Sequence, residues 1–105
     1  MEQPNIEYID KISLGNIDFK HKVLGIIKEE LPIEIDLYRY ALKNNDYQKA
    51  ANTVHKLKHK ICIFGFNESY LIAQSFEEAL HKGDNTLQND FEMILDIMED
   101  FIKKI

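Results

Sequence analysis

Residues 47–64 have the sequence YQKAANTVHKLKHKICIF, in which apolar side chains recur at three- and four-residue intervals. Ala50, Val54, Leu57 and Ile61 therefore fall along one side of an α-helix. The intervening positions are polar or charged. The segment predicts an amphipathic helix with one buried and one solvent-exposed face.

The rest of the chain carries similar patterns, and it contains only 4 glycines and 2 prolines. Further helices are expected at residues 7–13, from a cap at Asn16 or Asp18 to about residue 43, from a cap at Asn67 to about residue 82, and at about residues 86–104. Pro32 interrupts the second of these. Because proline removes a backbone donor and clashes with the preceding turn, we expect a kink or a break near residues 30–31.

Short connections between these helices determine the expected architecture. Links of two to six residues favour antiparallel neighbours, so we predict an all-α, up-and-down antiparallel four-helix bundle with a short extra N-terminal helix over one end. A chain of 105 residues is too short for two comfortable cores, so residues 1–105 are expected to form a single domain. The inward face of the fourth helix is expected to carry Leu71, Ile72, Ser75, Phe76 and Leu80.

Composition and charge argue against several classes of function. The net charge of −5 disfavours binding to nucleic acid or anionic lipid. No segment resembles a membrane span or a secretion signal, so a cytoplasmic location is expected. We also expect the chain to be a monomer. Met1 and the compact ends favour a free-standing protein over a fragment of a larger kinase. We interpret the lone Cys62 as a packing residue, because it has no partner for an internal disulfide.

One basic segment interrupts this acidic chain. Residues 47–67 contain no Asp or Glu, but they contain His55, His59 and the lysines at positions 49, 56, 58 and 60. At about 100° per residue, His55 lies opposite Leu57 and should face water. Five side chains project within roughly 60° of it: Ala51, Asn52, Lys58, His59 and Cys62. The sequence thus predicts an exposed strip that is open to another protein.

The same segment resembles the signature of the histidine-containing phosphotransfer (HPt) domain family. The resemblance rests on His55, an apolar residue two positions later, Lys58, and Gly65 ten positions after the histidine. Flanking similarity at residues 37–46 and 76–84 extends it to roughly residues 17–104. The departure is His59, because many family members carry glycine there, and both a second polar contact and a solvated surface histidine remain open for it.

The resemblance implies that His55 is a phosphoacceptor in a two-component phosphorelay and that Lys58 stabilises the phosphoryl charge. It implies a response-regulator receiver domain or a hybrid sensor histidine kinase as partner, with Mg²⁺ and most of the catalytic machinery on the receiver. The chain itself would be a phosphoryl carrier without a bound cofactor or metal. Further candidates are the partner contacts Ala51, Asn52, Lys56, His59 and Cys62, and the structural residue Gly65.

Two alternatives belong to other functional classes. The bundle could dock a helical partner without accepting phosphate. It could also bind a metal through His55 and His59 at positions i and i+4, although the neighbouring lysines would repel a cation. A smaller alternative concerns Glu77, which could approach the histidine helix but is interpreted as a solvated carboxylate. The kinase, the regulator and the direction of phosphate flow are not encoded in recognisable motifs.

Overall fold

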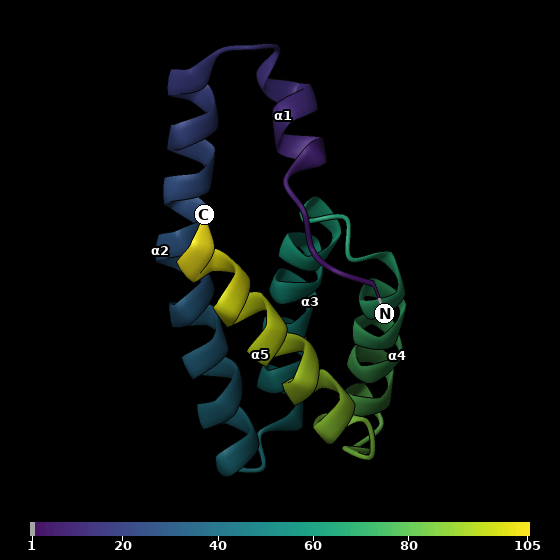
Figure 1. Ribbon diagram of the computed structural model, residues 1–105. Helices are drawn as coiled ribbons and strands as arrows, with labels where there is room; N and C mark the ends of the chain where they lie inside the picture. The colour runs from purple at the N-terminus through teal and green to yellow at the C-terminus, as the bar shows by residue number, and fades with distance from the viewer. Residues whose placement is uncertain (1) are drawn as a thin grey trace.

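The computed structural model describes residues 2–105 and consists of five α-helices joined by short turns (Figure 1). The helices are α1 (Glu7–Ser13), α2 (Ile17–Lys43), α3 (Tyr47–Ile63), α4 (Asn67–His81) and α5 (Gln88–Lys104). No β-strand occurs within residues 2–105. The predicted all-α fold is confirmed, and the predicted ends of the helices agree with the observed ones to within about two residues.

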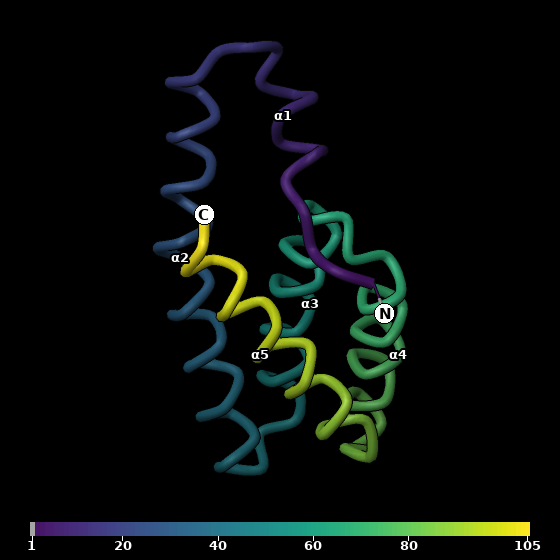
Figure 2. The backbone as a smooth tube through the Cα atoms, in the orientation of Figure 1, coloured from purple at the N-terminus to yellow at the C-terminus, as the bar shows by residue number. Residues whose placement is uncertain are grey.

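Helices α2 to α5 run alternately down and up the bundle, as Figures 1 and 2 show. Helix α2 spans the whole length of the bundle. Helix α1 lies beside the N-terminal part of α2, beyond the end of α3. The segment before α1 passes the turn between α3 and α4, where the Asn5 N–H donates to the Phe64 carbonyl at 2.8 Å. The short first helix therefore covers one end of the bundle, as predicted.

Helix α2 begins at the predicted asparagine cap and then continues without interruption. The Asn16 side chain accepts a hydrogen bond from the Phe19 N–H at 3.0 Å, so the alternative cap at Asp18 is not used. The break expected at Pro32 is wrong, since one helix runs from Ile17 to Lys43 without a sharp bend (Figure 1). Leu31 and Ile35 on either side of the proline are fully buried and hold both halves of the helix on the core.

The core is formed by apolar side chains from all five helices. On α3 the four residues of the predicted stripe are fully buried: Ala50, Val54, Leu57 and Ile61. The Tyr38 ring packs edge-on against Phe76 and Phe91, with ring centroids 6.1 and 5.2 Å apart. Such edge-to-face pairs are a favourable aromatic geometry. The bundle is thus centred on aromatic rings from α2, α4 and α5.

The predicted inward face of α4 is partly wrong. Leu71 is 61% exposed, and Ile72 and Ser75 also face solvent, whereas Ser69 and Ala73 are buried beside Phe76 and Leu80. Helix α4 accompanies α3 along its length (Figure 1). The buried stripe of α4 is therefore turned relative to the predicted one, and it includes two small residues.

The start of α4 also differs from the prediction. Asn67 is the first residue of the helix and does not cap it; Phe66 occupies the cap position without a side-chain hydrogen bond. The Glu2 carboxylate instead accepts from the Glu68 N–H at 2.8 Å. An acidic group from the N-terminal segment therefore satisfies a free donor at this helix end.

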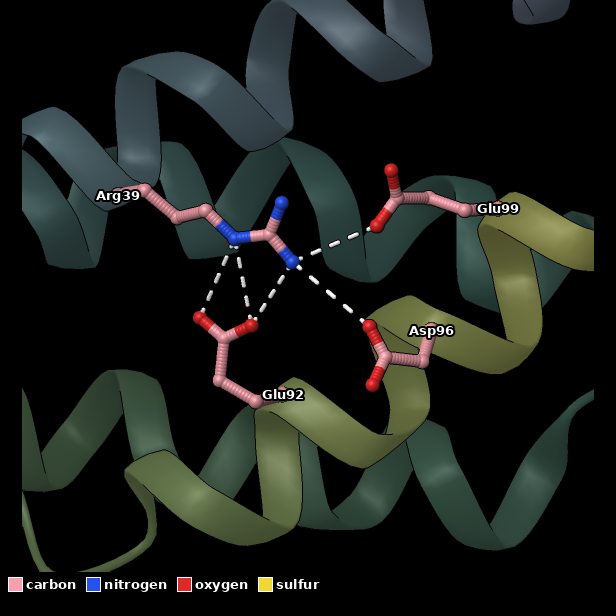
Figure 3. A network of polar contacts seen from close by, with 4 residues as sticks. All are labelled: Arg39, Glu92, Asp96 and Glu99. Atoms are coloured by element: carbon pink, nitrogen blue, oxygen red, sulfur yellow. Dashed lines mark hydrogen bonds and ion pairs between the residues drawn. The ribbon is translucent and has the colours of Figure 1, made fainter.

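A polar network joins α2 to α5 on the surface of the bundle (Figure 3). Arg39 donates from Nη2 to Glu92 at 2.9 Å and to Glu99 at 3.3 Å, and Asp96 lies 3.8 Å away. The hydrogen bond that Arg39 donates to the Glu92 carboxylate raises the pKa of Arg39 further above its already high ordinary value. Among residues 2–105, no helix combines the length and apolarity needed to cross a bilayer.

Candidate functional site

His55 lies in the middle of α3 with its ring directed away from the core. About half of the side chain, 51%, is accessible to solvent. Val54 and Leu57 on the same helix are fully buried, so their packing determines which way His55 points. The projection predicted for His55 from the helical period is confirmed.

A carboxylate from the neighbouring helix holds one nitrogen of this ring. Glu77 on α4 places Oε2 at 3.0 Å and Oε1 at 3.2 Å from Nδ1 of His55. A carboxylate only accepts, so Nδ1 carries the proton and Nε2 keeps its lone pair in the neutral ring. Glu77 is only 17% exposed, and the interpretation of this residue as a solvated carboxylate is therefore wrong.

Glu77 also binds the lysine of the predicted site. Its Oε1 lies 3.0 Å from Nζ of Lys58, and the Lys58 ammonium lies 5.8 Å from the centre of the Tyr70 ring. Burial acts to raise the pKa of Glu77, but hydrogen bonds and positive charge from Lys58, together with the His55 contact, outweigh it and lower that pKa below its ordinary value. Glu77 is therefore ionised at neutral pH.

Lys58 is less accessible than the helical projection predicted. Its side chain is only 11% exposed, because it lies against α4 between Glu77 and Tyr70. Ala51 lies two turns before Lys58 on the same side of α3 and is fully buried, so its predicted contact with a partner is wrong. Helix α3 is flanked by both α2 and α4, so its solvent-facing sector is narrower than for a helix with one neighbour.

His59 lies one turn after His55 and touches it. The two Nε2 atoms are 3.3 Å apart, and the rings are nearly perpendicular, with centroids 4.8 Å apart. Because Nδ1 of His55 is the protonated nitrogen, His59 is the donor and the His55 lone pair is the acceptor. His59 is thus an exposed histidine that also makes a polar contact with His55, so neither of the two roles left open for it is excluded.

The remaining predicted contact residues lie at the surface, and two of the predicted contacts also line a shallow recess. Asn52, Lys56 and Cys62 are exposed, so the packing interpretation of Cys62 is wrong. Cys62 and His59 line a shallow recess together with Tyr8 of α1 and Ile63. No sequence pattern pointed to Tyr8, because its place next to the last residues of α3 depends on how α1 is positioned in the folded protein.

The basic character of the segment is partly neutralised by its neighbours. The Lys60 ammonium lies 3.0 Å from Glu34 and 3.4 Å from Glu30, both on α2, and Lys58 is paired with Glu77. Lys56 remains on the exposed face. The positive strip expected from the sequence is therefore smaller in the folded protein.

Gly65 follows α3 with a positive φ of 68°, as expected for a glycine that ends a helix. It lies ten residues after His55, or roughly 15 Å along the helix axis. A Cβ at this position would lie 3.0 Å from Nδ2 of Asn5. The close neighbour is thus the N-terminal segment, and not a helix beside the histidine.

Metal ligands do not gather at this site. Across residues 2–105, no group of three or more His, Cys, Asp or Glu side chains is placed to hold a metal ion. His55 and His59 form a pair, with Glu77 directed to the other side of the His55 ring.

The fold and site define a helical bundle that presents an oriented imidazole to solvent. The model of the Hpt domain family matches residues 22–103, and the chain belongs to this family, as its sequence signature indicated. It is therefore a phosphotransfer module of the kind used in two-component phosphorelays, whose members interact with receiver domains and kinases. No curated protein and no solved structure matched the chain significantly. Helix α1 and the start of α2 lie outside the matched residues.

Proposed function

We propose that His55 accepts a phosphoryl group on Nε2 from the aspartate of a receiver domain and donates it to another. The observation that carries this proposal is the Glu77 carboxylate 3.0 Å from Nδ1. In the neutral ring it leaves Nε2 as the nitrogen that keeps its lone pair. A neutral imidazole in this tautomer is a nucleophile that needs no separate base.

In the proposed transfer, the atoms and charges balance without movement of a proton. The Nε2 lone pair attacks phosphorus, the N–P bond forms, the P–O bond to the aspartate breaks, and the aspartate leaves as a carboxylate. The phosphorylated ring keeps its Nδ1 proton and carries a positive charge, which the ionised Glu77 offsets at hydrogen-bond distance. Return of the phosphoryl group to a second aspartate reverses these changes.

Lys58 is proposed to offset the negative charge of the phosphoryl group. It lies about one turn from His55 on the same helix, and its ammonium shares Glu77 with the histidine ring. Because the lysine is held at one edge of the site, little side-chain freedom remains to be lost when the phosphoryl group arrives. Its contact with Glu77 also helps to keep that carboxylate beside Nδ1.

The partner is expected to provide what this chain does not. Phosphoryl transfer depends on in-line positioning and charge stabilisation, which a receiver domain with its Mg²⁺ would supply. We assign the contact surface to the exposed residues around His55: Asn52, Lys56, His59 and Cys62, with Tyr8 added from α1. The chain then acts as a carrier that exchanges its phosphoryl group with an aspartate only when a receiver is docked.

The test is transfer from phosphorylated receiver domains of the source organism, with Mg²⁺, to the wild-type chain, His55→Gln and His21→Gln. His21 is an exposed histidine on α2 and serves as the matched control. Label should appear on the wild type and the control but not on His55→Gln. Transfer that persists in His55→Gln would remove this residue from the proposed role, and binding without label on any variant would indicate a docking module.

A further inference from the structure

The acceptor nitrogen proposed above already has a hydrogen-bond partner within the protein. We propose that His59 is a gate on His55: it covers the Nε2 lone pair in the unphosphorylated protein and must move aside before transfer. This inference rests on the proposed function, because it takes Nε2 of His55 as the reacting atom. It makes His59 a positioning residue that sets how often His55 is free to react.

The direction of the hydrogen bond follows from the two partners of His55. Glu77 accepts from Nδ1, so the opposite nitrogen offers a lone pair and no proton. Nε2 of His59 lies 3.3 Å from that lone pair, and its N–H is the donor. His55 is thereby held from both sides, by an acceptor on α4 and by a donor on its own helix.

The same contact blocks the path of the reaction. A reacting phosphorus must come within about 3–3.5 Å of the nucleophile and in line with its lone pair. Nε2 of His59 already lies 3.3 Å from Nε2 of His55, within the range that the phosphorus must enter. The phosphoryl group and the His59 N–H therefore compete for one electron pair, and they cannot both use it.

The surroundings of His59 permit the required movement. The side chain is exposed and borders the recess formed with Tyr8, Cys62 and Ile63. Rotation of the ring toward this recess would uncover Nε2 without displacing a core side chain. Helix α3 and the Glu77 contact can stay in place, so the tautomer of His55 is preserved while the gate opens.

A small phosphoryl donor tests the gate without any partner protein. Potassium phosphoramidate transfers a phosphoryl group to imidazole nitrogen and releases ammonia. The rate at His55 is measured near pH 8, above the ordinary imidazole pKa of about 6.5, for the wild type, His59→Ala and the control His21→Ala. Phosphorylation of His81 in the same samples provides an internal reference. In parallel, ¹⁵N NMR of the His55 ring reports whether the Nε2 lone pair is hydrogen-bonded.

Removal of the gate should speed the reaction of His55, relative to His81, by about two- to tenfold, as expected for release of one exposed hydrogen bond. The Nε2 resonance should move toward that of a free lone pair in His59→Ala and stay unchanged in His21→Ala. An unchanged or slower rate, or an unmoved resonance, would overturn the gate. Failure of receiver domains to label His55 would instead contradict the proposed function, because phosphoramidate reacts without a receiver.

Discussion

Oε2 of Glu77 lies 3.0 Å from Nδ1 of His55, although the two residues are 22 positions apart and belong to different helices. The other oxygen of this carboxylate lies 3.0 Å from the Lys58 ammonium. One side chain of α4 thus orients the imidazole of α3 and holds its lysine. The site depends on the packing of two helices, even though the family signature lies on one.

The first prediction concerns how stability depends on pH through Glu77. Its pKa in the folded protein is below the ordinary value of 4.5, so its pairing stabilises the fold above that value and is lost as the pH falls through the lower, folded pKa. Glu77→Gln should lower the free energy of unfolding by about 1–3 kcal/mol at neutral pH, because Lys58 loses its charged partner. The gap from wild type should shrink in acid.

Urea denaturation between neutral pH and about pH 3 measures this gap, in the acid range where an ordinary carboxyl group titrates. Glu78→Gln, an exposed neighbour on the same helix, is the matched control and should stay within about 0.5 kcal/mol of wild type. A difference between Glu77→Gln and wild type that is the same at every pH would contradict the pairing.

The second prediction separates the contribution of Lys58 to stability from its contribution to phosphoryl transfer. A fully exposed lysine would contribute little to stability, but the Lys58 side chain is only 11% exposed. Lys58→Ala should therefore lower the free energy of unfolding by about 0.5–3 kcal/mol, whereas Lys58→Met should lose less because it keeps most of the packed stem. Both variants should slow transfer from a phosphorylated receiver. Transfer at the wild-type rate in Lys58→Met would remove the charge of Lys58 from the mechanism.

The third prediction tests the rotation of α3. Leu57 is fully buried, and Leu57→Ala should lower the free energy of unfolding by about 2–5 kcal/mol through lost burial and a residual cavity. Leu71→Ala removes the same atoms from a side chain that is 61% exposed, so it should change stability by less than about 1 kcal/mol. Thermal or urea unfolding of the two variants provides the comparison. Equal losses would mean that α3 or α4 is turned differently.

The fourth prediction compares two glycines with positive φ. A Cβ added at Gly15, at φ 80°, would meet open space, whereas a Cβ at Gly65, at φ 68°, would lie 3.0 Å from the Asn5 side chain. Gly15→Ala should cost about 1–2 kcal/mol from the backbone alone. Gly65→Ala should cost more, because Asn5 must also shift. Equal melting temperatures for the two variants would show that Asn5 moves without penalty.

The family and the orientation of His55 could be predicted from the sequence. Helical spacing within residues 47–64 placed Leu57 inside and His55 outside, and both placements are confirmed. The positive φ of Gly65 at the end of α3 is likewise a local requirement of the backbone. A helix period of 3.6 residues relates neighbours along one chain without reference to the rest of the fold.

The predictions were wrong where packing against another helix determines whether a side chain is exposed. Ala51 and Lys58 were placed on an exposed strip, and Glu77 was interpreted as a solvated carboxylate, because the helical projection contains no information about what covers each side. The break at Pro32 failed similarly, since burial of the flanking residues keeps α2 continuous. The sequence signal for Glu77 was its place in residues 76–84, which resemble the family.

The amino-acid sequence by itself determined the five helices, the family and the outward direction of His55, because these follow from local backbone geometry and from periodic burial. Only the tertiary structure decided which nitrogen of His55 keeps its lone pair, since that depends on the Glu77 carboxylate of α4 lying beside Nδ1. The physical reason is the distance along the chain over which each effect acts. Hydrophobic periodicity acts within one helix, whereas a hydrogen bond between side chains of two helices requires the helices to pack at a particular distance and rotation.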